Sequence, residues 1–129
     1  MKQEDKELLL KDLCARLPYS PFVQLMEKFD DEDTEHFMEI HQLSTYDIEL
    51  FNSGEISNIK PYLRPMSSMT EEEKVEYGDR CYFALNCIYE NQQYYFNELF
   101  DWLNKKMFDF RGLIEKGLAL STEVFNPYK

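Results

Sequence analysis

The chain has 129 residues, and its 14 Lys and Arg against 25 Asp and Glu give a formal net charge of −11. This length favours a single domain with a core of its own, and a composition of 43% hydrophobic and 16% aromatic residues excludes intrinsic disorder despite the charge. The acidic balance disfavours contact with nucleic-acid phosphates, so we expect no direct nucleic-acid partner.

Membrane and secretory classes are also disfavoured by the sequence. The longest leucine run, Leu8–Leu10, is far shorter than the ~20 apolar residues of a membrane-spanning helix. The mixed charges of residues 1–7 do not form a secretory signal. The three cysteines, Cys14, Cys81 and Cys87, are an odd number without C-x-x-C spacing, which favours a reducing compartment over a disulfide framework. We therefore expect a cytoplasmic protein with no membrane partner.

The hydrophobic pattern changes along the chain and predicts one α+β domain that covers residues 1–129. An N-terminal helix (1–19) precedes a β segment (20–66), and a helical segment (67–129) completes the domain. The β segment is predicted to form a small antiparallel sheet of three to four strands, with barrel-like closure as an option. The C-terminal helices are expected to pack on this sheet.

Leucines at a spacing of four predict an amphipathic helix over residues 4–17. Leu9, Leu13 and Leu17 lie on one face of this helix, and Pro18 ends it because proline lacks the backbone donor. The residues predicted to face away from the leucine stripe are Lys6, Lys11 and Asp12.

Alternating polar and apolar residues predict the strands of the β segment. Asn52 and Gly54 favour a hairpin turn over residues 52–55. Pro61 favours an edge position or a strand end, because proline cannot donate to a ladder. The predicted strands are 22–29, 35–43, 46–50 and 56–63.

The helical segment begins with the clearest local signal in the chain. Thr70 and Glu73 have the spacing of a capping box, which predicts the start of a helix that runs into the 80s. A second helix is predicted by apolar residues that recur at i, i+4, i+7 and i+11. The face of the first helix predicted to be apolar contains Tyr77, Cys81, Leu85 and Ile88. The stripe of the second helix contains Phe96, Leu99, Phe100, Trp102, Leu103 and Met107.

Three segments of the chain are distinctive in their order: KELLLKDLCARLPY (6–19), PYLRPMSSMTEEE (61–73), and DWLN with FDFRGLIEKGLAL (101–104 and 108–120). They cover a little over a third of the chain and resemble an uncharacterised family of small proteins from gut-anaerobe genomes and their prophages or other mobile elements. The resemblance implies an origin in such an element but no catalytic residues, since the family has no established activity. Ser20 stands where the family usually has glycine, and Lys106 and Met107 stand where it often has histidines. Chemistry based on those histidines is therefore not open to this chain.

The residue types that usually catalyse reactions or bind metals are sparse. His36 and His41 point to opposite faces of a strand, or lie ~140° apart on a helix, so they do not converge on a metal that needs three or four ligands. Cys14 and Cys81 lie on or beside apolar helix faces and are predicted to be buried. The acidic run at 30–33 lacks the ligand spacing of a calcium-binding EF-hand loop and is interpreted as a solvated loop. We therefore expect no catalytic residue, no metal and no cofactor.

Charge is unevenly distributed along the chain. Residues 27–55 contain ten acidic residues and one basic residue, whereas residues 102–129 contain three acidic and five basic residues. A solvated acidic face accounts for this distribution. A contact surface for a basic partner and a nucleic-acid mimic that inhibits a DNA-handling protein are the alternatives. The acidic residues assigned to such a contact are Asp30, Asp31 and Asp33.

Aromatic residues between positions 77 and 110 are too dense for single helical stripes to bury. Tyr82, Phe83 and Tyr95 lie on different sides of their helices, and Tyr and Trp are enriched at protein interfaces. The predicted function is therefore a non-enzymatic binding or accessory protein that contacts another protein or a second copy of itself. An acidic nucleic-acid mimic and a small enzyme with an unrecognised site are the alternatives. The residues assigned to the contact are Tyr82, Tyr95, Trp102, Phe108, Phe110 and Arg111.

Overall fold

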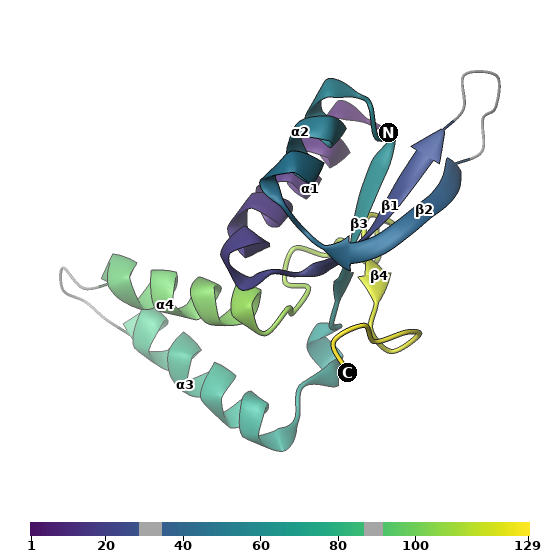
Figure 1. Ribbon diagram of the computed structural model, residues 1–129. Helices are drawn as coiled ribbons and strands as arrows, with labels where there is room; N and C mark the ends of the chain where they lie inside the picture. Colours follow the sequence, from purple (N-terminus) through teal and green to yellow (C-terminus); the bar gives the residue numbers. More distant parts are fainter. Residues whose placement is uncertain (29–34, 87–91) are drawn as a thin grey trace.

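A computed structural model describes residues 1–28, 35–86 and 92–129, and over these residues it contains four α-helices and a four-stranded sheet (Figure 1). The predicted α+β class, with a helix, then a sheet, then helices, is confirmed. The helices are α1 (Gln3–Arg16), α2 (Thr45–Ser53), α3 (Glu71–Asn86) and α4 (Gln92–Lys105), with short 3₁₀-helices η1 (Leu17–Tyr19) and η2 (Met66–Ser68). The strands are β1 (Phe22–Lys28), β2 (Glu35–Gln42), β3 (Asn58–Leu63) and β4 (Leu120–Ser121).

The sheet is open and mixed, with the strand order β2-β1-β3-β4. β1 is antiparallel to both β2 and β3, as predicted, whereas β4 comes from the C-terminal part of the chain and runs parallel to β3. The barrel-like closure considered from the sequence is wrong, because β2 and β4 stand at opposite ends of the strand order and do not pair with each other among the described residues. Helices α1 and α2 cover one face of the sheet (Figure 1).

The segment predicted as a strand over 46–50 is helix α2. The Ser44 side chain accepts a hydrogen bond from the Asp47 backbone N–H at 3.3 Å, and the Asp47 carboxylate accepts one from the Ser44 backbone N–H at 2.9 Å. This capping box favours a helix over the short alternating pattern that suggested a strand. Gly54 ends α2 at φ +87°, which glycine adopts without strain, so the predicted hairpin turn at 52–55 is a helix C-cap.

β3 lies between β1 and β4 in the strand order, but at Pro61 only the side that faces β1 is paired, which is a local edge position of the kind that proline favours. Residues 58–61 of β3 pair with β1, and residues 62–63 pair with β4. Pro61 lies where pairing on one side of β3 gives way to pairing on the other side. Its missing backbone donor is tolerated because the ladder to β4 begins only at the next residue.

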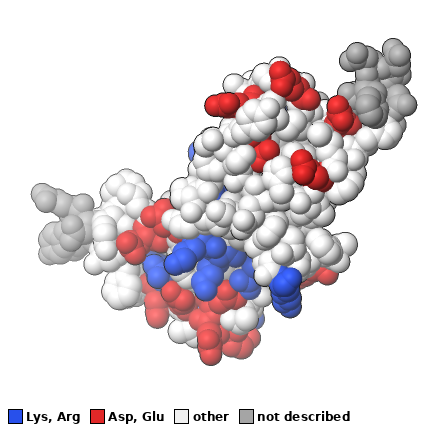
Figure 2. All heavy atoms as spheres, in the orientation of Figure 1, with Lys and Arg blue, Asp and Glu red and all other residues white. Residues whose placement is uncertain are grey.

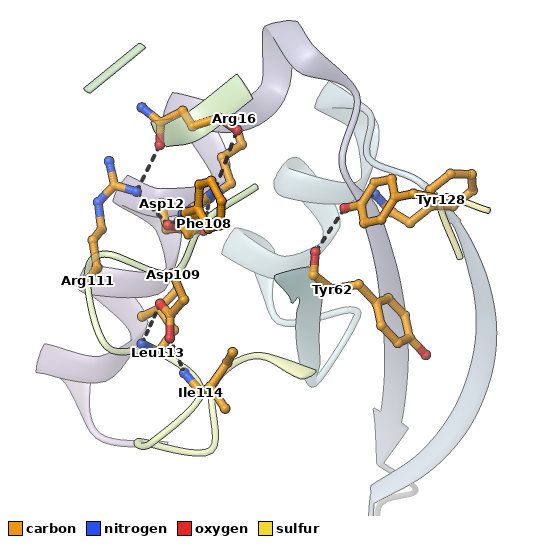
Figure 3. Close-up of polar contacts among 11 residues, drawn as sticks. Asp12, Arg16, Tyr62, Phe108, Asp109, Arg111, Leu113, Ile114 and Tyr128 are labelled. Carbon is orange, nitrogen blue, oxygen red and sulfur yellow. Dashed lines mark hydrogen bonds and ion pairs between the residues drawn. The ribbon is translucent and has the colours of Figure 1, made fainter. Parts of the chain in front are cut away.

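The C-terminal tail completes the sheet next to Pro61 through the side chain of Tyr128. The last paired residues of β1 and β3 are Val23 and Pro61. One position further on, the Tyr128 hydroxyl accepts a hydrogen bond from the Phe22 backbone N–H at 3.0 Å and donates one to the Tyr62 carbonyl at 2.9 Å (Figure 3). The hydroxyl therefore bridges the two strands where direct pairing has ended.

Two hydrophobic clusters form the interior. The larger one lies between α1, α2 and the sheet, and the smaller one lies within the α3–α4 hairpin and the segment that follows α4. The hairpin extends away from the sheet (Figure 1). Central members of the larger cluster are Leu9, Leu13, Val23, Leu25, Phe51, Ile59 and Leu63. The smaller cluster consists of Leu99, Trp102, Leu103 and Phe108, with Tyr77 and Cys81 packed against it.

The capping box predicted at Thr70 is present: Thr70 Oγ1 accepts from the Glu73 backbone N–H at 3.1 Å, and Glu73 Oε1 accepts from the Thr70 backbone N–H at 3.0 Å. The predicted apolar face of α3 is only partly correct. Ala84 is fully buried, whereas Leu85 is exposed. Only one side of α3 meets α4, and Leu85 lies one position beyond that side. Ile88 lies outside the described residues.

Candidate interaction surface

Asp12 and Arg16 form a fully buried ion pair on α1, so the prediction that Asp12 faces away from the core is wrong. Arg16 Nε lies 3.0 Å from both carboxylate oxygens of Asp12, and Arg16 Nη2 donates to the Phe108 carbonyl at 2.7 Å (Figure 3). Burial lowers the pKa of Arg16 below its usual value, although pairing with Asp12 opposes the shift. The pair is tolerated in the interior because its polar atoms are hydrogen-bonded.

Arg111 approaches the same carboxylate from the segment that follows α4. Its Nη1 lies 2.5 Å from Asp12 Oδ1 and 3.2 Å from Asn104 Oδ1 (Figure 3). Its guanidinium carbon lies 4.2 Å from the centre of the Phe110 ring. Arg111, which the sequence assigned to a contact with a partner, therefore binds residues of its own chain. Its contacts hold the fold together.

Two further residues assigned to the contact are interior. Phe108 and Trp102 are buried, and their ring centres lie 5.7 Å apart in the smaller cluster. Phe110 is half-buried and stacks on Phe100 at 5.6 Å. These rings fill space between α4 and the following segment, which leaves them unable to form the centre of an exposed contact.

The three distinctive sequence segments, which lie within 6–19, 61–73 and 101–120, meet in space. The Asp109 backbone N–H donates to the Arg64 carbonyl at 2.8 Å, and the Arg64 backbone N–H donates to the Met107 carbonyl at 2.7 Å. Arg16 reaches the Phe108 carbonyl from the first segment. Asp109 also accepts hydrogen bonds from two backbone N–H groups of the third segment, at 2.8 and 2.9 Å. These segments, far apart in sequence, form one structural unit.

Four aromatic side chains gather on the surface of the α3–α4 hairpin, and we call them the aromatic surface: Tyr82, Phe83, Tyr94 and Tyr95. Phe83 and Tyr95 stack across the two helices with ring centres 5.9 Å apart. Tyr82 lies edge-on to Phe83 at 5.8 Å, and Tyr94 lies edge-on to Tyr95 at 5.4 Å. Tyr82, Phe83 and Tyr94 are 63%, 55% and 59% exposed.

The helical geometry explains why these rings are exposed. Successive residues of an α-helix point about 100° apart, so neither Tyr82 with Phe83 nor Tyr94 with Tyr95 can turn both rings to the hairpin interior. Ala84 and Leu99 occupy that interior instead. The sequence assigned Tyr82 and Tyr95 to the contact but not Phe83 and Tyr94. The sequence signal that would have found Phe83 and Tyr94 is the presence of two consecutive aromatic residues on each helix.

Two shallow hollows flank the stack of Phe83 on Tyr95. Arg80 borders the first, and its Nη1 lies 3.6 Å from Glu98 Oε2, which links α3 to α4. An aromatic centre with a polar rim is the usual composition of a protein interface. The first hollow, of about 180 Å³, is lined by Arg80, Phe83, Tyr94, Tyr95 and Glu98. The second, of about 230 Å³, is lined by Tyr82, Phe83, Asn86 and Tyr95.

The acidic residues assigned to a contact, Asp30, Asp31 and Asp33, lie outside the described residues. The His41 ring lies 2.7 Å from Asp47 Oδ2 and 3.4 Å from Glu39 Oε2, beside the start of α2. Among the described residues, no group of three or more His, Cys, Asp and Glu is arranged to hold a metal ion.

The two cysteines that the structure describes differ from their predicted burial. Cys14 is exposed, which corrects the prediction, and Cys81 is half-buried. Cys14 lies one position beyond Leu13 on α1 and so falls outside the buried leucine stripe. Both thiols are free.

Comparison of the chain with protein-family models, with curated proteins and with solved structures found no match. Over residues 1–28, 35–86 and 92–129, no helix has the length and apolar character needed to cross a bilayer. The function of the chain must therefore be inferred from its own geometry.

Proposed function

We propose that the protein is a non-enzymatic binding protein that contacts a protein partner through the aromatic surface. The observation that carries this proposal is the exposure of three stacked or edge-on rings, Tyr82, Phe83 and Tyr94, each more than half accessible to water. Burying apolar surface contributes roughly 25 cal/mol per Å². A partner that covers these rings would gain this free energy, and contiguous exposed apolar patches commonly mark interaction sites.

The chemistry of the aromatic surface supports a protein partner. Tyrosine rings give a large contact area at a small entropy cost and keep a hydroxyl for hydrogen bonds at the rim. Arg80 and Glu98 beside the stack supply charged groups for such a rim. Aromatic and arginine side chains dominate binding energy at protein interfaces. We expect Phe83, at the centre of the ring contacts, to contribute most.

We expect this contact to form in the cytoplasm. Cys14 is exposed with a free thiol, and Cys81 is also free. Exposed thiols persist in reducing compartments, whereas oxidising compartments favour disulfides.

The test compares the wild type with Phe83→Ser and with Tyr46→Ser, which removes a ring that is 64% exposed on α2, away from the hairpin. Light scattering and affinity capture from the cognate cell extract measure self-association and partner binding. We expect the wild type and Tyr46→Ser to give the same complex and Phe83→Ser to weaken it at least tenfold. Circular dichroism checks that both variants fold.

Two results would contradict the proposal. The first is a wild type that stays monomeric and captures nothing. The second is a folded Phe83→Ser variant that binds as well as Tyr46→Ser.

A further inference from the structure

A groove of about 750 Å³ lies between the C-terminal end of α4, the end of η2 and the C-terminal tail. It shares no residue with the aromatic surface, so binding in this groove would be independent of the proposed function. Four basic side chains line it: Arg64, Lys105, Lys106 and Lys129.

The charge of this groove is opposite to that of the whole chain. The chain carries a net charge of −11, yet the four basic side chains of the groove meet one acidic lining residue, Glu123. Within the part of the chain that the structure describes, Lys105, Lys106 and Lys129 form no ion pair. Figure 2 shows Lys and Arg gathered on this face over the C-terminal part of α4, beside a band of Asp and Glu over α3.

Arg64 has a different role in the groove from the lysines. Its Nη1 and Nη2 donate to Glu73 at 2.8 and 2.6 Å, and its guanidinium lies 4.2 Å from the centre of the Phe108 ring. These contacts fix one cation at the wall of the groove. The three lysines are exposed, so their ammonium groups are free to close on a ligand.

The backbone fixes the position of Lys105, the last residue of α4, and of Lys106, which follows it. Met107 follows them at φ +63°, a left-handed conformation that a non-glycine residue adopts only when its surroundings hold it there. The Met107 carbonyl accepts the Arg64 backbone N–H at 2.7 Å, which holds this turn against β3. The end of α4 and the wall that carries Arg64 are therefore joined by a backbone contact.

We propose that this groove binds a small phosphorylated ligand of the nucleoside phosphate class. Lysine ammonium groups are common phosphate ligands, and the volume lies in the range of roughly 300–1,000 Å³ that is usual for small-molecule sites. Tyr128, which is 37% exposed, lines the same groove and offers apolar surface to a base or sugar. A long polyanion fits less well, because the band of acidic side chains on α3 borders the groove and would repel it.

Calorimetric titration with ATP, pyrophosphate and inorganic phosphate, without divalent cations and at physiological salt, tests this assignment. The groove variant is Lys105→Gln/Lys106→Gln. The matched control is Lys11→Gln/Lys74→Gln, which removes the same charge from exposed lysines outside the groove. We expect ATP to bind the wild type and the control equally and to bind the groove variant about tenfold more weakly.

Phosphate and pyrophosphate distinguish the sources of the binding energy. Binding of ATP more tightly than pyrophosphate supports a ligand of the nucleoside phosphate class, whereas equal binding would assign the site to the phosphates alone and would overturn the nucleoside part of the proposal. NMR shifts of the backbone amides at 105–107, 122–126 and 128–129 locate the ligand in the wild type, where variant folding is not in question. Absence of binding at millimolar ATP, equal weakening in both double variants, or tighter binding of a single-stranded oligonucleotide than of ATP would overturn the proposal.

Discussion

Arg111 Nη1 lies 2.5 Å from Asp12 Oδ1, although the two residues are 99 positions apart in the chain. Arg16 binds the same carboxylate from the next turn of α1. One buried carboxylate therefore pairs with two guanidinium groups and joins the first helix to the segment after α4. Removing one member of a buried pair leaves an uncompensated charge, which costs more than the pair itself contributes.

We expect Asp12→Ala to lower the free energy of unfolding by about 3–5 kcal/mol, because Arg16 would stay buried without its counter-charge. Equilibrium urea unfolding measures this change. Glu4→Ala is the matched control, since Glu4 is an exposed acidic residue of the same helix, and its effect should stay within about 0.5 kcal/mol. A loss below about 1 kcal/mol for Asp12→Ala would show that the pair is not needed for stability.

Glu73 connects the start of α3 to Arg64, and this contact predicts a second stability effect. The hydrogen bonds from Arg64 hold the pKa of Glu73 at about 2, well below its usual value. Glu73→Gln weakens these charge-assisted bonds, so we expect a loss of about 1–2 kcal/mol at neutral pH. Glu72→Gln, on the exposed side of the same turn, should change stability by less than about 0.5 kcal/mol. Urea unfolding of the three proteins checks both values.

The advantage of wild type over Glu73→Gln should also depend on pH. The folded pKa of about 2 lies below the usual 4.5, so the stabilisation by the carboxylate is present above pH 4.5 and is lost as the pH falls through about 2. We expect the two unfolding free energies to converge over that window. Curves that stay parallel down to pH 2 would contradict the assignment of the low pKa to this contact.

Elements fixed by neighbouring residues could be predicted from the sequence. The capping box at Thr70 and Glu73 and the leucine spacing of α1 are local signals, and the structure contains both. Residues 46–50 fit two patterns at once. Their polar and apolar residues alternate, as in a strand, and the Ser44–Asp47 capping box at their start is typical of a helix. A short window cannot decide between such patterns, whereas packing against the core can.

The candidate site was less predictable than the fold, because its burial depends on distant partners. Asp12 stands beside a leucine stripe, and nothing near it in sequence indicates that Arg111 will pair with it. Trp102 and Tyr82 are both large aromatic residues of the helical segment, yet Trp102 is buried and Tyr82 is exposed. The pairing of α3 with α4 decides this difference, and residue type does not.

His41 gives a pH-dependent contribution to stability. Burial lowers the pKa of His41, but its hydrogen bonds and charge interactions with Asp47 and Glu39 outweigh burial and raise the pKa above 6.5. Protonated His41 therefore stabilises the fold below pH 6.5, and this stabilisation is lost as the pH rises through the folded value. We expect His41→Gln to lower the melting temperature near pH 5.5 and to have little effect near pH 8.5.

Thermal unfolding of wild type, His41→Gln and His36→Gln separates this effect from the general loss of a histidine. His36 is the other histidine of the chain and lies on the same strand, β2. His36→Gln measures how much the loss of a histidine elsewhere on this strand changes the melting temperature at the two pH values. If His41→Gln kept the wild-type difference between acid and alkaline pH, the carboxylates around His41 would not be its cause.

The Tyr128 hydroxyl replaces a rung of the ladder between β1 and β3, so its removal tests how the C-terminal tail supports the sheet. Tyr128→Phe leaves the Phe22 N–H and the Tyr62 carbonyl without this partner, and we expect a loss of about 1–3 kcal/mol in urea unfolding. Tyr46→Phe, which alters an exposed ring, should have an effect below about 0.5 kcal/mol.

The Tyr128 hydroxyl also makes the difference in unfolding free energy between wild type and Tyr128→Phe depend on pH. Burial raises the pKa of Tyr128 to about 12 from its usual 10, so the fold favours the protonated phenol. Its stabilisation is complete below pH 10 and declines as the pH rises towards 12. The advantage of wild type over Tyr128→Phe should therefore shrink across that interval. An advantage that stays constant up to pH 12 would mean that the ring, which lies edge-on to Phe22 at 5.3 Å, holds the tail and the hydroxyl does not.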